Sequence, residues 1–469
     1  MNIPLTQEQK VIHLLNRTSF GPTRETAQRV NRLGIHAYLE EQLSPEKISD
    51  TLVEEKLAGL KTMRLSSREL IELYPPPRQQ AGQEMMGQQP MQGPRFVILE
   101  LQQARLLRAV YSQRQLYEVM VDFWSNHFNI FAAKGADRWL ATAYDRDTIR
   151  PHALGRFKDL LLATAQSPAM LFYLDNWLSA SPNATARFAA NNRRRGLNEN
   201  YARELMELHT LGVDGGYTQK DVQEVARCFT GWTIRQPRSE GTFYFEPRIH
   251  DSGEKLVLGT RIPPGGGMED GLRVIDLLAS HPATARFISL KLARRFVADD
   301  PPPSLVNKAA ETFRQSEGNI PTVLRTLIDS PEFFSPETYQ AKVKKPLDFV
   351  AGALRITGAE VHISHQLLRY LGRMGEPLFL AQPPTGFPDA GASWASPDML
   401  LTRMNFAIDL IANRIPGSRV RIESLADKDS FARLIAPDTL SAGTRSALAE
   451  TEDSQAFTLL MAAPEFQRR

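Results

Sequence analysis

Apolar side chains recur at three- and four-residue steps along most of the chain, and this spacing predicts a mainly helical fold. The longest run covers residues 96–131 and reads as one extended helix. Residues 147–175 predict a helix pair, because proline in Ser167-Pro168 begins a helix more easily than it continues one. The same spacing predicts helices over 6–16, 22–44, 268–280, 283–297, 304–315 and 319–329, and two or three more within 338–413.

A short β structure is predicted in the middle of the chain. Thr242–Phe245 and Leu256–Leu258 are β-branched, aromatic and aliphatic runs on either side of a loop that contains His250, Asp251 and Gly253. We therefore expect these two runs to pair with each other. The predicted fold class is mainly α, a multi-helical globular fold with a small β-hairpin insertion.

Composition and pattern divide the chain into five regions. Residues 74–95 are rich in Pro, Gln, Gly and Met and cannot pack a core, so we expect a flexible surface loop there. With 469 residues, the rest of the chain is long enough for a large buried core. The other predicted regions are an N-terminal helical region over 1–73, a central helical core over 96–240, the β-hairpin with a Gly-rich loop over 241–267, and a C-terminal helical region over 268–469.

Residues 198–233 carry the densest set of ionisable groups, in two short helical runs joined by a Gly-rich turn. At 3.6 residues per turn, Asn200, Arg203, Glu204 and Glu207 lie on one face of the first run. Two carboxylates three residues apart can converge on one divalent cation or exchange protons with a substrate. We therefore expect this face to hold a metal ion or to take part in acid–base chemistry.

The alternative for this face is a solvated, salt-bridged stripe. Arg203 lies beside the two carboxylates, and Arg193, Arg194 and Arg195 come shortly before them, so internal pairing would satisfy the same charges. The arginine run itself is typical of a solvated surface, although it can also bind an anion such as phosphate or sulfate. His209 projects to the opposite side, where we expect a buried histidine that donates to a backbone carbonyl.

A second polar stripe lies within the long apolar run. If this run is helical, Glu118, Asp122, Asn126 and Asn129 share one side, and His127 lies beside Phe123. Should the stripe face the carboxylates of segment 198–233, the two helices would form a pocket like those of helical-bundle metal proteins. Neither helix has a Glu-x-x-His pair, which disfavours a di-iron site, and buried polar groups that join helix to helix are the alternative. The predicted metal ligands are Glu204, Glu207, Asp122, Asn126 and His127.

His250 and Asp251 are neighbours in the loop between the two predicted strands. A histidine and a carboxylate in a loop can supply a base and its orienting group. Adjacent residues rarely hydrogen-bond in the required geometry, so we expect Asp251 to orient another group. The alternative is a turn in which Asp and Gly serve backbone geometry alone. The predicted catalytic residues are His250, Asp251 and Arg203.

The charge balance and the absent motifs narrow the classes of function. The chain has 56 Lys and Arg against 53 Asp and Glu, and this net charge of +3 argues against general nucleic-acid binding. No apolar run is long enough for a membrane span and the first residues lack a signal-peptide pattern, so we expect a cytoplasmic protein. Cys228 is the single cysteine, which excludes an internal disulfide. Gly265–Gly267 lacks the ending of a phosphate loop, so nucleotide binding is not supported.

Short motifs spread over nearly the whole chain carry a resemblance to a known family. Besides segment 198–233 they are His13–Arg17 with Phe20–Thr23, Phe123–Asn129, Arg150–Phe157, Gly386–Asp389 with Trp394, and Ala463–Phe466. Together these motifs closely resemble a bacterial family catalogued as domain of unknown function 1800, whose name assigns no reaction. Families of this type are often encoded beside a sulfatase-like or alkaline-phosphatase-like protein, so the resemblance implies a partner of that kind.

Three functional hypotheses follow from these residues. The first is a metal-assisted hydrolase or transferase with a divalent metal ion, for which zinc, manganese, magnesium and iron all remain open. The second is a non-catalytic helical scaffold or binding module, accessory to a sulfatase-like partner, in which the polar groups fix the fold. The third is a haem protein with His127 or His209 as axial ligand, although no haem attachment motif occurs.

Overall fold

The computed structural model is built almost entirely from helices, which confirms the predicted mainly α fold. Residues 77–92 of the predicted flexible loop and the arginine run 193–195 lie outside the residues that the structure describes. These described residues are 3–76, 93–182, 196–362, 365–425 and 427–469.

The N-terminal region consists of short helices whose ends are fixed by specific residues. The Thr6 hydroxyl accepts from the backbone N–H of Gln9, and the Gln9 side chain accepts from the N–H of Thr6, so the first helix begins with a capping box. The predicted helix 22–44 is interrupted at Gly34, whose φ of +87° suits glycine alone. The helices are α1 (Gln7–Thr18), α2 (Arg24–Leu33), α3 (Ile35–Gln42), α4 (Thr51–Leu57) and α5 (Ser67–Leu73).

The long apolar run forms two helices, α6 (Pro94–Tyr111) and α7 (Gln115–His127), so the prediction of one helix over 96–131 is wrong. Asp50 stabilises the break between them. Its Oδ2 accepts from the Ser112 hydroxyl at 2.7 Å, and its Oδ1 accepts from the backbone N–H of Gln113 at 2.7 Å. These bonds satisfy donors that a continuous helix would direct elsewhere.

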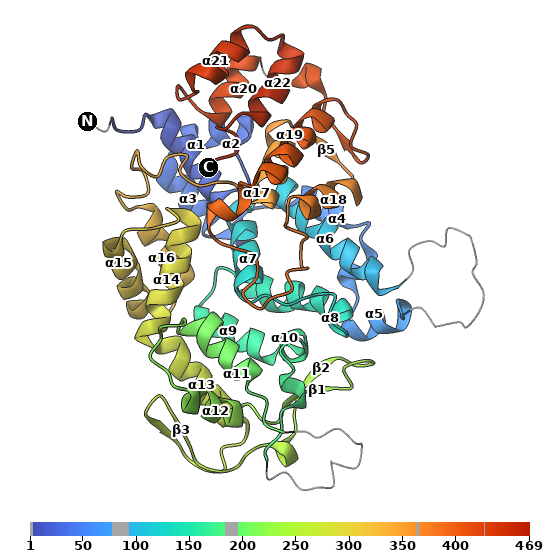
Figure 1. Ribbon diagram of the computed structural model, residues 1–469, viewed down its shortest axis with the longest axis vertical. Coiled ribbons are helices and arrows are strands. Elements are labelled where there is room, and N and C mark those ends of the chain that lie inside the picture. The colour runs from blue at the N-terminus through green and yellow to red at the C-terminus, as the bar shows by residue number, and fades with distance from the viewer. Residues whose placement is uncertain (1–2, 77–92, 183–195, 363–364, 426) are drawn as a thin grey trace, which may run out of the picture.

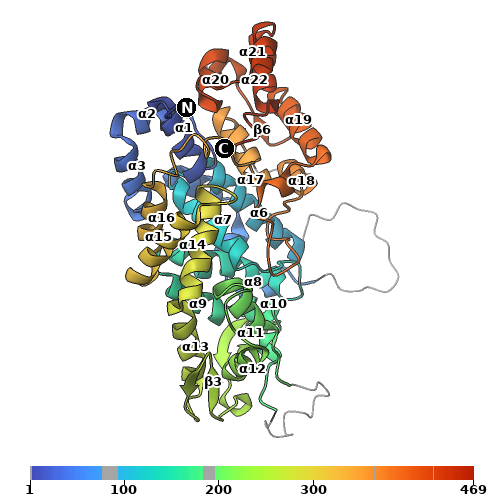
Figure 2. The same cartoon turned by 60° about the vertical axis from the view of Figure 1, so that its left-hand side comes forward.

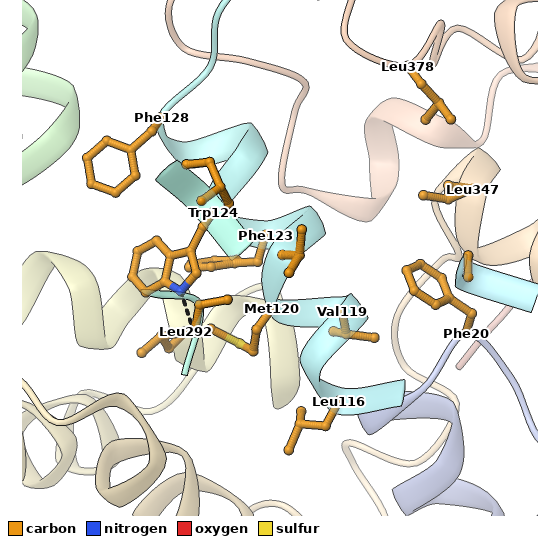
Figure 3. Packing of buried hydrophobic residues seen from close by; sticks show 14 of the residues in the cluster. Phe20, Leu116, Val119, Met120, Phe123, Trp124, Phe128, Leu292, Leu347 and Leu378 are labelled. Atoms are coloured by element: carbon orange, nitrogen blue, oxygen red, sulfur yellow. Dashed lines mark hydrogen bonds between the residues drawn. The ribbon is translucent and has the colours of Figure 1, made fainter. Parts of the chain in front are cut away.

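Helix α7 forms the centre of the hydrophobic core. Trp124 is completely buried, and its indole N–H donates to the carbonyl of Ala153 at 3.0 Å (Figure 3). Phe123, Phe128 and Leu292 pack around it, and the ring centroids of Phe123 and Trp124 are 4.8 Å apart. One side of α7 is therefore held rigidly, which fixes where its polar stripe points.

Two helices of the central region continue into π-helical turns. Helix α8 (Asp137–Ala143) passes into η3 (Tyr144–Ile149), and α11 (Asn200–Glu204) passes into η7 (Leu205–Thr210). The wider turn rotates the following side chains relative to an α-helix, and such turns are frequent at functional sites. A projection at 3.6 residues per turn is therefore inexact beyond Glu204. The neighbouring helices are η4 (Arg150–His152), α9 (Phe157–Gln166), α10 (Pro168–Tyr173) and α12 (Gln219–Cys228).

The strands of the described residues pair only as two-stranded antiparallel units. The predicted pairing of Thr242–Phe245 with Leu256–Leu258 is wrong, although both runs contain strand residues. Leu258 and Gly259 have φ values of +49° and +76°, so the chain turns back at once and the second run pairs with the residues that follow it. The pairs are β1 (Trp232–Arg235) with β2 (Thr242–Phe245), β3 (Lys255–Val257) with β4 (Thr260–Ile262), and β5 (Glu360–Val361) with β6 (Ser418–Arg419).

The C-terminal half follows the predicted helices closely, with ends that differ by one or two residues at most in the first four. No helix of the described residues is both long and apolar enough to cross a membrane. The helices are α13 (Met268–Ser280), α14 (Pro282–Phe296), α15 (Pro303–Gln315), α16 (Ile320–Ile328), α17 (Pro346–Ile356), α18 (His365–Arg373), α19 (Pro397–Ile411), α20 (Lys428–Ile435), α21 (Ala442–Ala449) and α22 (Asp453–Ala462).

The molecule is elongated, and α7 lies near its middle (Figures 1 and 2). Helices α20, α21 and α22 form one end, whereas α11, α12 and α13 with β3 form the opposite end. The segment between α18 and α19 returns from the first end to the centre, where its backbone contacts α7. Segments far apart in the sequence therefore meet beside the polar stripe of α7.

Candidate functional site

A small cavity lies where the polar stripe of α7 meets α6, η3 and the segment between α18 and α19. Its volume is about 40 Å³. This is room for about three water molecules, since one water needs at least 10–15 Å³ by this measure. Its charged and amide side chains come from five separate parts of the chain, and they are Arg105, Asp122, Asn126, Asn129, Asp145, Lys345 and Glu376.

Arg105 is the central cation of this cavity. It projects from α6, its side chain is 3% exposed, and it contacts Asp122 at 3.2 Å, Asp145 at 2.6 Å and the Ser125 hydroxyl at 2.8 Å. Its Nε has no hydrogen-bond partner among the described residues. The guanidinium therefore compensates two carboxylates and keeps one buried donor unused.

A second buried arginine completes an ion-pair network behind the cavity. Arg150 donates to both carboxylate oxygens of Glu118 at 2.9 Å and, through Nε, to Asp145 at 2.9 Å. Burial alone would raise the pKa of Asp145, but the guanidinium groups of Arg150 and Arg105 lower it well below its ordinary value. Glu118 and Asp145 are therefore structural partners of arginines, and the first of them does not line the cavity.

Glu376 is the unusual acid of the site. It is 3% exposed, and its Oε2 accepts from the backbone N–H of Leu347 at 2.7 Å. Burial, and after it the charge of Asp122, raises the pKa of Glu376 to about 8, although Lys345 acts in the opposite direction. The Glu376 side chain is therefore mostly protonated at neutral pH and can donate a hydrogen bond or a proton.

Two asparagines hold the segment 376–389 in place: Asn126 in α7, and Asn129 just after its C-terminal end. Asn126 donates to the carbonyl of Phe387 at 3.0 Å and accepts from its N–H at 2.7 Å. Asn129 donates to the carbonyls of Ala381 at 3.0 Å and Pro383 at 2.8 Å. Asn126, which the sequence suggested as a metal ligand, thus has both side-chain groups engaged with backbone.

Phe379 forms one wall of the cavity in an uncommon backbone conformation. Its φ is +61°, which costs a residue with a bulky side chain about 1–2 kcal/mol. Its carbonyl accepts from the N–H of Ala132 at 3.0 Å, and its ring lies over the guanidinium of Arg105 at 4.9 Å. The neighbouring Leu378 carbonyl accepts from Gln102 at 2.8 Å, so the wall is held from both α6 and the end of α7.

Glu204 and Glu207, the two carboxylates predicted to bind a metal, lie elsewhere, on α11 and η7. Glu207 accepts from the Tyr217 hydroxyl at 3.2 Å. Burial, followed by the charge of Glu207, raises the pKa of Glu204 above its ordinary value. Arg203 is directed to Glu199 and Gln219, at 3.4 and 2.9 Å, so it does not lie in the cavity.

The two histidines of the centre form a buried pair. His127 donates through Nε2 to the carbonyl of His209 at 3.1 Å, and the ring centroids are 6.2 Å apart. His209 thus accepts through its backbone, and its Nε2 has no partner among the described residues. Burial, with the charge of Lys291, lowers the pKa of His209 to about 3 and that of His127 well below 6.5, so both rings are neutral.

The residues predicted as metal ligands do not converge on one point. Asp122 and Asn126 line the cavity, His127 points to His209, and the two glutamates lie on α11 and η7. Among the described residues, no group of three or more His, Cys, Asp and Glu side chains is arranged to hold a metal ion. The polar stripe of α7 faces the segment 376–389, and it does not face Glu204 and Glu207.

His250 and Asp251, predicted as catalytic residues, have separate partners near the strands. His250 donates through Nδ1 to the carbonyl of Thr230 at 2.7 Å, and its Nε2 lies 3.1 Å from Asp270. Asp251 accepts from two nitrogens of Arg227 at 3.0 and 3.2 Å, so it orients another group, as its adjacency to the histidine predicted. Neither residue lines the cavity.

The sequence interpretation overlooked four charged residues of the cavity: Arg105, Asp145, Lys345 and Glu376. A charged residue inside the apolar run of α6 was one available signal, because arginine is seldom fully buried unless it is paired. A lysine directly before Pro346 was another, since a cation is unfavourable at the start of a helix. Glu376 follows Gly375 and Met374 in the sequence without any pattern that distinguishes it.

Comparisons with known proteins identify the family and nothing more specific. A search of curated proteins finds no match, and a search of solved structures finds none either. A family model described as a protein of unknown function, DUF1800, matches residues 13–468. This match covers all the motifs that carry the resemblance and the whole cavity. The chain therefore belongs to the DUF1800 family.

Proposed function

We propose that the protein is an enzyme of the hydrolase or transferase type whose acid–base chemistry takes place in the cavity of Arg105, Asp122, Lys345 and Glu376. One observation carries the proposal. Glu376, a buried carboxyl group whose pKa burial raises to about 8, lines the same cavity as Asp122, a carboxylate that is ion-paired with Arg105. Such a pair lets one group donate a proton and the other accept one, and cations nearby stabilise negative charge as it develops.

Infrared difference spectroscopy tests this assignment directly. The wild-type protein is expected to show a protonated carboxyl band at pH 7 that becomes smaller as the pH rises through about 8, because Glu376 then loses its proton. The band should be smaller in Glu376→Gln, where only the buried Asp137, whose pKa burial also raises, still contributes. It should be unchanged in Glu317→Gln, whose side chain is exposed. A band of unchanged size in Glu376→Gln would refute the assignment.

Activity gives the second part of this test. Wild type, Glu376→Gln and Glu317→Gln are compared on chromogenic esters, phosphate and sulfate esters and glycosides between pH 5 and pH 9. Turnover that is lost only in Glu376→Gln supports the enzyme, and loss of a general acid typically costs 10²–10⁴-fold in rate. Equal turnover in all three proteins would place the chemistry elsewhere.

A metal-assisted form of the enzyme is supported by Glu204 and Glu207. Burial, and after it the charge of Glu207, raises the pKa of Glu204, so the two carboxylates repel each other. Arg203 forms its hydrogen bonds with Glu199 and Gln219. A bound divalent cation would remove this repulsion. His250 and Asp251 would contribute proton transfer only if a substrate reached the strands.

Elemental analysis of the purified protein checks the metal. Near-stoichiometric metal in the wild type is expected to disappear in Glu204→Gln/Glu207→Gln while the thermal melt stays cooperative. Glu54→Gln/Glu55→Gln removes the same charge from exposed positions of α4 and should keep the metal. A metal-free wild type, or full metal in both double variants, would contradict a site at these two glutamates.

A binding role beside a sulfatase-like or alkaline-phosphatase-like partner is the alternative function. An exposed apolar stripe on α19 supports it, since Leu401, Met404 and Ile408 are 58%, 46% and 42% exposed next to a groove of about 450 Å³. Contiguous apolar surface of this kind is typical of protein contacts. The buried ion pair of Glu118 with Arg150 also fits a non-catalytic protein, in which such polar groups only stabilise the fold.

A further inference from the structure

Two cationic side chains, Arg105 and Lys345, line the cavity, and one of their donors has no hydrogen-bond partner among the described residues. This donor is the Nε of Arg105. Lys345 is 9% exposed, and the acidic group nearest to its Nζ is Asp389 at 3.9 Å, which is too long for a hydrogen bond. Asp389 is closer to another cation, Lys291, at 3.0 Å. A buried donor without a hydrogen bond is costly, so an occupant of the cavity that supplies an acceptor oxygen to the Arg105 Nε would be favourable.

The carboxylates of the cavity do not prevent an anion from binding, because arginines neutralise their negative charge. Asp122 pairs with Arg105, and Asp145 pairs with Arg105 and Arg150. Glu376 keeps its proton at neutral pH and adds one more donor. Lys345 has no ion pair shorter than 3.9 Å among the described residues, and it lines the same cavity as Arg105.

The size of the cavity limits the occupant. A volume of about 40 Å³ holds roughly three water-sized atoms, which matches the three heavy atoms of a carboxylate group. A phosphate or sulfate group has five heavy atoms and would require the walls to move. One wall is Phe379, which is held by the Ala132 N–H, and the segment around it is held by Gln102 and Asn129. These bonds resist enlargement of the cavity.

We propose that this cavity binds the carboxylate group of a small substrate, between the guanidinium of Arg105, the ammonium of Lys345 and the carboxyl group of Glu376. The inference rests on the proposed function and names its substrate class. Arginine and lysine together provide charge-assisted hydrogen bonds to the two carboxylate oxygens. Glu376 then lies next to the substrate, where it can deliver its proton.

Binding should weaken at alkaline pH, because an ionised Glu376 repels an anion. The charges around Glu376 come from several elements: Asp122 on α7, Lys345 before α17, Asp348 on α17 and Arg403 on α19. Within this set it is the loss of the Glu376 proton that changes the charge of the cavity near pH 8. The affinity for a carboxylate is therefore expected to be constant below neutral pH and to fall above about pH 8.

The experiment follows ¹³C-labelled formate by NMR in the presence of the full-length protein, with ionic strength held constant by chloride. Saturable binding is expected in the wild type, with displacement by acetate and not by sulfate or phosphate. Lys345→Met should bind at least about tenfold more weakly, because it loses a charge-assisted hydrogen bond. Lys158→Met removes a half-exposed lysine paired with Asp276 and should bind as the wild type does.

Three results would overturn the inference: no saturable binding by the wild type, equal binding by Lys345→Met and Lys158→Met, or displacement by sulfate as strong as by acetate. If Lys345→Met does not fold, the pH dependence of the wild type decides, and unchanged affinity from pH 6 to pH 9 counts against the site. The infrared band separates the two proposals. A Glu376 band without formate binding refutes only the substrate class, whereas formate binding without that band refutes only the proton donor.

Discussion

Replacing Arg150 by methionine is expected to lower the free energy of unfolding by about 3–5 kcal/mol, the largest loss that a single side chain of this region should produce. Arg150 donates to both oxygens of Glu118 and to Asp145, and the exposed fractions of the three side chains are 8%, 2% and 4%. The variant leaves two carboxylates in the core with one cation fewer. Methionine keeps much of the volume, so the loss measures charge more than cavity formation.

Urea denaturation at pH 7 checks this expectation, with Arg156→Met as the matched control. Arg156 forms an ion pair with Glu317 in which the two side chains are 51% and 76% exposed. Exposed pairs contribute between 0 and 1 kcal/mol, so this variant should stay close to the wild type. Similar midpoints for both variants would show that the network behind the cavity is not a source of stability.

The sequence predicts a helix correctly where the spacing of its apolar residues alone decides where it begins and ends. Helix α13 (Met268–Ser280) has the bounds that the sequence predicted, because its apolar positions follow one uninterrupted period. The break between α6 and α7 was not predictable, since it depends on Asp50, a residue far away in the chain. The pairing of β3 with β4 was missed because the chain reverses at Leu258 and Gly259, whose φ angles are both positive. Leucine seldom adopts a positive φ, so the sequence gives no clear signal of a turn at this position.

The candidate site was predictable only in part, for a similar reason. The stripe that contains Asp122 and Asn126 follows from helical spacing within α7, and both residues do line the cavity. Its partners come from other segments: Arg105 from α6, Lys345 from the start of α17, and Glu376 from the chain after α18. Periodicity describes one element at a time, whereas a cavity depends on how elements pack.

Glu376 should make the protein less stable as the pH rises, whereas an ordinary ion-paired carboxylate makes a protein more stable as the pH rises. The pKa of Glu376 is about 8 in the folded protein against 4.5 for an exposed glutamate. Below pH 4.5 the side chain is protonated in both states and contributes its full stability. Between these values only the folded state keeps the proton, so the free energy of unfolding falls by about 1.4 kcal/mol per pH unit.

Over the range from pH 5 to pH 8, Glu376 should therefore cost the wild type on the order of 4 kcal/mol, a loss that Glu376→Gln cannot show. The measurement is the difference in unfolding free energy between wild type and this variant at each pH, because all other titrating groups then cancel. Glu317→Gln, which changes an exposed glutamate, should give a difference that is flat over the same range. A flat difference for Glu376→Gln as well would mean that Glu376 is ionised in the folded protein. The cavity would then hold a carboxylate pair compensated by Arg105 and Lys345, and no proton donor would remain there.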